Sequence, residues 1–236
     1  MIYELHGKIP QNSSFIYSED ILTSTIFGNL RYLKSTDLLN SFLSKARNLN
    51  SDNFCLPFSE KITMNFWRKY PRKTNSQINE PDLVLEDENQ VMIIECKYHS
   101  PLDENYSHDD SQYMNQLLRY SSILEEYYSH KENKNMIFLT LKDYPIEQVF
   151  EKTQKKLPKG INLYWLRWED LYTCLSKYME TVIDVGEKNI TCDLRDFLIQ
   201  RQLKFFSGIK IPDISYSWKY NRNVKYTFSS KFENYE

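Results

Sequence analysis

The first part of the chain changes from helical to strand spacing of its hydrophobic residues. From Ser18 the hydrophobic positions recur at helical intervals behind two acidic residues, which predicts a helix with Ser18 as its N-cap. A second helix is expected over residues 37–49 on the same spacing. Residues 61–67 instead alternate between hydrophobic and other side chains, which predicts a half-buried strand before a polar loop at 71–79.

The middle of the chain has the pattern of a hairpin followed by a helix. Strands are expected at 82–85 and 91–98, separated by the turn-like segment 86–89. A polar stretch then leads into a helix over 111–128.

The second half continues with strands and helices in turn. Strands are expected at 135–141 and 161–168, with a short lysine-rich helix or loop between them, and a helix at 169–179. This order predicts an α/β fold in which helices flank a central mixed β-sheet.

The sequence pattern changes after this core. A helix is expected over 190–206, followed by a tail that interleaves basic and aromatic residues. Such a tail suits base stacking with phosphate contacts, but packing of an added hairpin or a subunit interface explains it better. We therefore expect a core at 1–180 and a C-terminal helical and aromatic extension at 181–236 packed on it.

Composition and cysteine usage restrict the class of protein. The 236 residues are 41% hydrophobic and 26% charged, which are ordinary values for a globular chain. No hydrophobic run approaches the ~20 residues of a membrane span, and the N-terminus has no leader pattern, so a cytoplasmic protein without membrane contact is expected. The four cysteines are scattered singly, which predicts reduced, mostly buried thiols and no zinc or iron–sulfur site.

Candidate chemistry is concentrated in the predicted hairpin. Because side chains alternate along a strand, Glu95 and Lys97 face the same side, and Asp82 can meet them across the strand pair. Two carboxylates can hold Mg²⁺ through oxygen, and the lysine ammonium can then position or activate a water molecule.

This arrangement resembles the motif of the PD-(D/E)XK nuclease superfamily. Its two parts are here Pro81-Asp82 and Glu95-Cys96-Lys97, and the resemblance extends over residues 18–179 because the order of elements also agrees. It implies a restriction-endonuclease-like core. A second E-x-K match, at 132–134, lies in a polar connection with no strand before it.

The resemblance also implies the roles of individual residues. Asp82, Glu95 and the carbonyl of Cys96 would be ligands of Mg²⁺ or Mn²⁺, and Lys97 would position the nucleophilic water. The family often adds an acidic residue from the preceding helix, for which Glu19 is the candidate.

Simpler explanations exist for several of these residues. Asp20 is a close second candidate to Glu19, but both carboxylates are equally well explained by favourable charge at a helix N-terminus. Asp82 could be a solvated acid at a strand start, and Glu95 with Lys97 could form an exposed cross-strand ion pair. Burying an acid at the end of a hydrophobic strand, however, requires a partner or a metal.

A second motif lies on the helix after the hairpin. Gln116 and Tyr120 are one turn apart on one face of that helix. They resemble the Q-x-x-x-Y element of RecB-type nucleases, in which these side chains face the active site. The alternative is a half-buried pair on an amphipathic helix.

The function expected from these features is metal-dependent hydrolysis of DNA. The resemblance implies an endonuclease with a role in restriction or antiphage defence. A DNA exonuclease or repair nuclease, and a catalytically inactive nucleic-acid-binding or scaffold subunit of a larger complex, are the alternatives. The net charge of −2 provides no general attraction to DNA, so a local basic patch, bound metal, a homo-oligomer or a partner protein must supply affinity.

Overall fold

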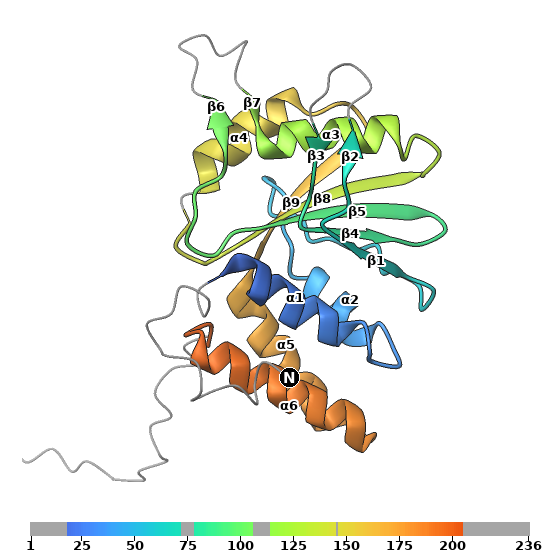
Figure 1. The fold of residues 1–236 in the computed structure, drawn as a ribbon, viewed down its shortest axis with the longest axis vertical. Helices are drawn as coiled ribbons and strands as arrows, with labels where there is room; N and C mark the ends of the chain where they lie inside the picture. Colours follow the sequence, from blue (N-terminus) through green and yellow to red (C-terminus); the bar gives the residue numbers. More distant parts are fainter. Residues whose placement is uncertain (1–17, 72–77, 106–113, 145, 205–236) are drawn as a thin grey trace, which may run out of the picture. The chain divides into compact units, whose positions relative to one another are not determined.

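The described part of the chain is a β-sheet with helices on both faces (Figure 1). The computed structural model describes residues 18–71, 78–105, 114–144 and 146–204. The main sheet has five strands in the order β1-β4-β5-β8-β9. Strands β1, β4 and β5 pair antiparallel, whereas β8 and β9 are parallel to β5, which confirms the predicted mixed sheet. The strands are β1 (Thr63–Phe66), β4 (Leu83–Glu86), β5 (Gln90–Cys96), β8 (Asn133–Thr140) and β9 (Ile161–Arg167).

Two small ladders lie where the sequence predicted no strand, and β7 (Met114–Asn115) replaces the start of the helix predicted over 111–128. Strand β2 (Tyr70–Pro71) pairs with β3 (Ile78–Asn79), and β6 (Glu104–Asn105) pairs with β7. Each strand has two residues, which is too short for an alternating hydrophobic pattern to be visible.

The predicted helices form, but several of their ends differ from the sequence reading. Helix α2 stops at Leu43 rather than near residue 49, and α3 starts at Gln116 because Asn115 caps it by accepting from the Leu118 amide at 2.9 Å. The segment left open as helix or loop is a helix, α4. The helices are α1 (Glu19–Leu30), α2 (Asp37–Leu43), α3 (Gln116–Glu126), α4 (Ile146–Lys156), α5 (Trp168–Thr181) and α6 (Val185–Gln200).

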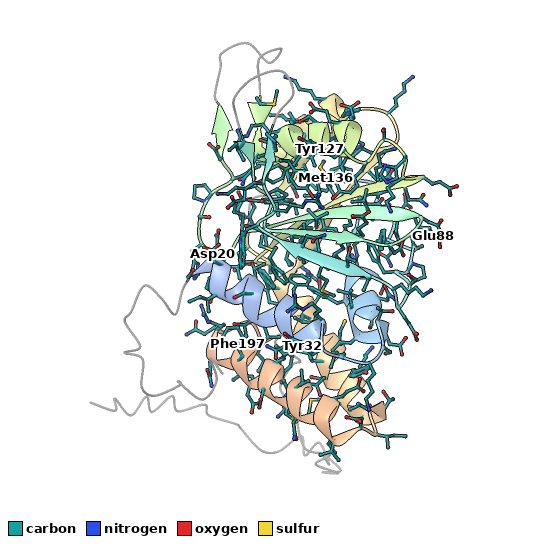
Figure 2. All side chains as sticks on the ribbon, turned by 45° about the vertical axis from the view of Figure 1, so that its right-hand side comes forward. Asp20, Tyr32, Glu88, Tyr127, Met136 and Phe197 are labelled. Atoms are coloured by element: carbon teal, nitrogen blue, oxygen red, sulfur yellow. The ribbon has the colours of Figure 1, made fainter. Side chains whose placement is uncertain are left out.

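Strand β5 separates two hydrophobic cores. Met92, Ile94 and Cys96 belong to the core formed with α1, α2, α5 and α6, whereas Val91 and Ile93 belong to the core formed with α3 and α4. Figure 1 shows the corresponding layers, and Figure 2 shows side chains filling the space on both sides of the sheet. Because every residue of β5 is buried, this strand is the centre of the fold.

Helix α6 belongs to the same packed unit as the sheet. Leu194, Phe197 and Leu198 are buried in the core that also contains residues of α1 and α5. Helix α6 is thus part of the core on this face of the sheet. The basic and aromatic tail, at 205–236, lies outside the described residues.

The structure meets the expectations for the cysteines only in part. All four cysteines are free thiols, as predicted, but only Cys96 and Cys174 are buried, and Cys55 is exposed. No helix in the described ranges combines the length and the hydrophobicity that crossing a membrane requires.

Candidate active site

The motif residues meet at the carboxyl end of β5. The register pairs Leu83 with Ile94, so the next position on each strand places Asp82 opposite Glu95. The Asp82 carboxylate accepts a hydrogen bond from the Cys96 amide, with 2.7 Å between Oδ2 and N. The sequence prediction that Asp82 meets the second half of the motif across the hairpin is thus confirmed in geometry.

Glu95 and Lys97 form a buried ion pair. Lys97 Nζ lies 2.7 Å from Glu95 Oε1, and their side chains are 11% and 1% exposed. The backbone around Lys97 is fixed, because its amide donates to Leu139 O at 2.8 Å and the Trp168 indole donates to Lys97 O at 3.1 Å. The alternative of an exposed cross-strand pair is therefore wrong.

Glu19 joins these residues from the first turn of α1. Its Oε2 lies 3.8 Å from Lys97 Nζ. Its Oε1 accepts from the Tyr98 amide at 2.8 Å and from both the amide and the hydroxyl of Ser100, at 3.2 and 2.6 Å. Asp20, the other candidate from this helix, is exposed. Glu19 therefore ties α1 to the segment that follows β5.

The helix motif forms a hydrogen-bonded pair beside the strands. Gln116 Nε2 donates to the Tyr120 hydroxyl at 2.8 Å, and that hydroxyl donates to Glu80 O at 3.1 Å. Tyr120 is buried, and Gln116 is half-buried. The pair therefore links α3 to the segment that leads into Asp82.

Burial controls the ionisation of the two acids. Loss of solvent and the nearby Asp82 charge together raise the pKa of Glu95 to about 8, although Lys97 opposes both. Loss of solvent likewise raises the pKa of Asp82 to about 6, against the Cys96 hydrogen bond. For Lys97 burial lowers the pKa, but Glu95, Glu19 and Asp82 together raise it by more, so the ammonium is favoured.

Glu95 has oxygen atoms that the described residues do not satisfy. Both carboxylate oxygens are buried, and no donor of the described residues meets them at full hydrogen-bond geometry. The Lys97 ammonium and the Tyr120 hydroxyl nevertheless lie close enough to lower the pKa of Glu95. A buried carboxylate in this state favours a bound cation or a proton. Within the described ranges, no cluster of three or more His, Cys, Asp or Glu side chains is placed to hold a metal ion.

Trp67 is a residue of this region that no pattern in the sequence had indicated. Its amide donates to Asp82 O at 3.2 Å, and its φ of 46° is rare for a bulky side chain. Its indole N–H is buried and has no acceptor among the described residues. Positive φ is expected from glycine or asparagine, so no local signal could have identified it.

No protein-family model matches this sequence, and no curated protein or solved structure matches it either.

Proposed function

We propose that this protein is a metal-dependent nuclease of the PD-(D/E)XK type that hydrolyses phosphodiester bonds in DNA. The observation that carries the proposal is the buried Glu95 carboxylate, which lies beside Asp82 and Lys97 at the end of one strand with both oxygens short of hydrogen bonds. A structural ion pair does not require a second acid at the same place.

The donor set suits a hard divalent cation. Asp82 and Glu95 would hold Mg²⁺ or Mn²⁺ through carboxylate oxygen, and the Cys96 carbonyl would be a further ligand by the resemblance. Glu19 remains a candidate only through Oε2, because Oε1 already accepts three hydrogen bonds. A cation bound there would stabilise charge on the phosphate and lower the pKa of a bound water.

The remaining side chains would orient the reacting groups. Glu95 and Glu19 hold the Lys97 ammonium from two sides, and its raised pKa keeps it protonated. A protonated lysine orients a water or a phosphate oxygen and does not remove a proton. Gln116 would contribute from α3, where its hydrogen bond to Tyr120 fixes its direction.

The order of elements also supports this proposal. Helix α1 precedes the three antiparallel strands β1, β4 and β5. Helix α3 then leads to β8, which is parallel to β5. A role in restriction or antiphage defence, and a homo-oligomer or partner protein that supplies DNA affinity, are part of the same proposal.

The second candidate function is that of an exonuclease or repair nuclease. The hydrogen bond between Gln116 and Tyr120 favours it, because it forms the Q-x-x-x-Y element that resembles RecB-type nucleases. An inactive binding module is disfavoured, because Asp82, Glu95 and Lys97 are all present. Lys97 pairs with Glu95, and Asp82 accepts from the amide of Cys96 between them.

The test uses purified full-length protein with four substrates: supercoiled plasmid, linear duplex, single-stranded DNA and RNA. Each is incubated with Mg²⁺, Mn²⁺ or EDTA, with Glu95→Gln as the inactive variant and the exposed Glu180→Gln as its matched control. Nicking of closed circles identifies an endonuclease, and digestion only from ends identifies an exonuclease. Failure of the wild type to cut any substrate with either metal would overturn the proposal.

A further inference from the structure

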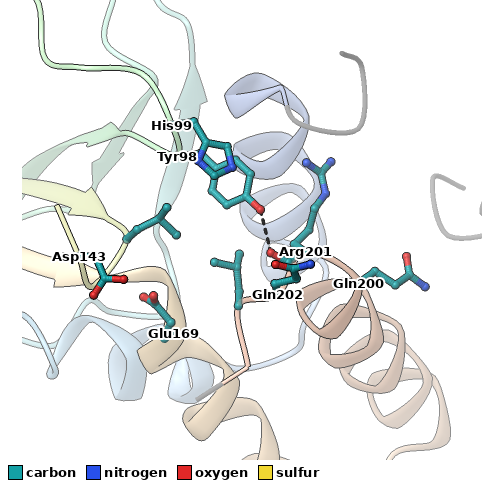
Figure 3. A pocket seen from close by; sticks show the side chains of 9 residues that line it. Tyr98, His99, Asp143, Glu169, Gln200, Arg201 and Gln202 are labelled. Carbon is teal, nitrogen blue, oxygen red and sulfur yellow. Dashed lines mark hydrogen bonds between the residues drawn. The ribbon is translucent and has the colours of Figure 1, made fainter. Parts of the chain in front are cut away.

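A cavity of about 220 Å³ lies outside the carboxyl ends of β5 and β8 (Figure 3). Its walls come from the segments after the parallel strands β5 and β8, from the first turn of α5 and from the C-terminal end of α6. The space outside the carboxyl ends of parallel strands is where open α/β sheets bind ligands. The residues that matter here are Tyr98, His99, Leu141, Asp143, Glu169 and Arg201.

Tyr98 connects this cavity to the catalytic residues. It follows Lys97 directly, and its amide donates to Glu19. Its hydroxyl donates to Arg201 O at 2.7 Å, which is the dashed line in Figure 3. The exposed His99 ring packs on Tyr98 with 4.0 Å between ring centroids. The cavity thus has an aromatic wall one residue away from the lysine.

The polar atoms of the cavity favour a ligand that donates hydrogen bonds. Glu169 Oε1 accepts from the Lys142 amide at 3.1 Å, whereas Oε2 is buried and accepts from none of the described residues. Asp143 adds a second carboxylate, and the buried Arg201 adds one cation. Two acids against one guanidinium disfavour an anion such as a phosphate group.

The size of the cavity narrows the class of ligand. The cavity is smaller than the roughly 300–1,000 Å³ of pockets for drug-sized ligands. A single planar group that carries an amine suits the carboxylates and the volume of this cavity, whereas a nucleoside triphosphate or a duplex does not.

We propose that this cavity binds one nucleobase of a single-stranded substrate and prefers bases with an exocyclic amine. This proposal rests on the proposed nuclease function. The base would stack against the aromatic wall, and its amine would donate to the Glu169 carboxylate. A base inside a duplex cannot reach such a cavity without leaving the stack, so single-stranded or unpaired DNA is the substrate class.

The main experiment measures base preference around the cleavage position. A randomised single-stranded DNA is cut in the presence of Mn²⁺, and the product ends are sequenced. For the wild type we expect one position at which adenine, cytosine and guanine are favoured over thymine by about tenfold, the scale of a hydrogen bond to a charged group. Glu169→Gln should reduce this preference to less than about twofold, and the exposed Glu180→Gln on the same helix should leave it unchanged.

A second variant tests the cavity by volume and not by charge. Leu141→Phe should fill part of the cavity and slow cleavage of a normal strand. When the strand carries an abasic nucleotide at the preferred position, Leu141→Phe and the wild type should cleave it at the same rate. Circular dichroism confirms that each variant is folded before its preference is compared.

A binding measurement separates this proposal from the nuclease proposal. A single strand that contains 2-aminopurine is titrated with Glu95→Gln, and burial of the base should quench its fluorescence. Leu141→Phe in the same background should abolish the quenching. If the wild type cuts DNA with a flat base profile and no quenching occurs, the base site is overturned and the nuclease stands. If quenching occurs but no strand is cut, the nuclease proposal fails and the cavity remains a base-binding site.

Discussion

Lys97 Nζ lies 2.7 Å from Glu95 Oε1, at a place where the glutamate is 1% exposed. Charges are seldom buried so deeply unless they are paired, and one lysine does not satisfy a glutamate that also faces Asp82. The arrangement is therefore destabilising in a purely structural role, and the proposed metal ion between the two acids would offset this cost.

Glu95→Gln should abolish cleavage and leave the fold intact. The substitution keeps nearly the same volume, but it removes the charge that would bind the metal. The loss should exceed about 10²-fold in kcat, the scale on which removing a transition-state stabilising group is felt. Plasmid cleavage beside circular dichroism measures both effects. Retained cleavage with Mg²⁺ would show that Glu95 is not part of the site.

Lys97→Ala should separate metal binding from turnover. Calorimetric titration with Mn²⁺ should show unchanged or slightly tighter binding, because a like charge near the cation is removed. Cleavage should nevertheless fall by about 10²-fold or more. The exposed Lys177→Ala provides the matched control. If cleavage instead changed by less than about twofold, Lys97 would be only a structural partner of Glu95.

The stability of the metal-free protein should fall as pH rises from about 4.5 to 8. The pKa of Glu95 is raised from 4.5 to about 8 in the fold, so the folded chain holds a proton that the unfolded chain has released. The unfolding free energy then decreases with pH in this window, by at most about 1.4 kcal/mol per pH unit for one proton. Urea unfolding in EDTA measures it. In Glu95→Gln the unfolding free energy should depend less steeply on pH. Equal slopes of unfolding free energy against pH in the wild type and in Glu95→Gln would refute the raised pKa of Glu95.

Arg68 and Lys69 should supply part of the local positive charge that a chain of net charge −2 lacks. Both are exposed, and they follow Trp67, whose amide contacts Asp82. Replacing both with alanine should weaken DNA binding and reduce the slope of log affinity against log salt by about 0.7–0.9 for each cation. Fluorescence anisotropy on Glu95→Gln at several salt concentrations measures this slope. An unchanged slope would place the DNA elsewhere.

The local part of the site could be read from the sequence. Glu95 and Lys97 share a side because side chains alternate along any strand, and Asp82 lies opposite because a hairpin brings its own strands together. Both rules act over short distances along the chain. The hairpin and the first helix were predicted for the same reason, whereas the mixed sheet was predicted from the order of the elements along the chain.

Only tertiary packing decided what surrounds these residues. Glu19 and Tyr98 are 79 residues apart, and Tyr98 and Arg201 are 103 apart, yet each pair is hydrogen-bonded. Hydrophobic periodicity indicates which face of a helix is buried, but not against which partner, so neither contact could be derived from spacing. The choice between Glu19 and Asp20 and the cavity beyond Tyr98 therefore depended on how α1, α5 and α6 pack against the sheet.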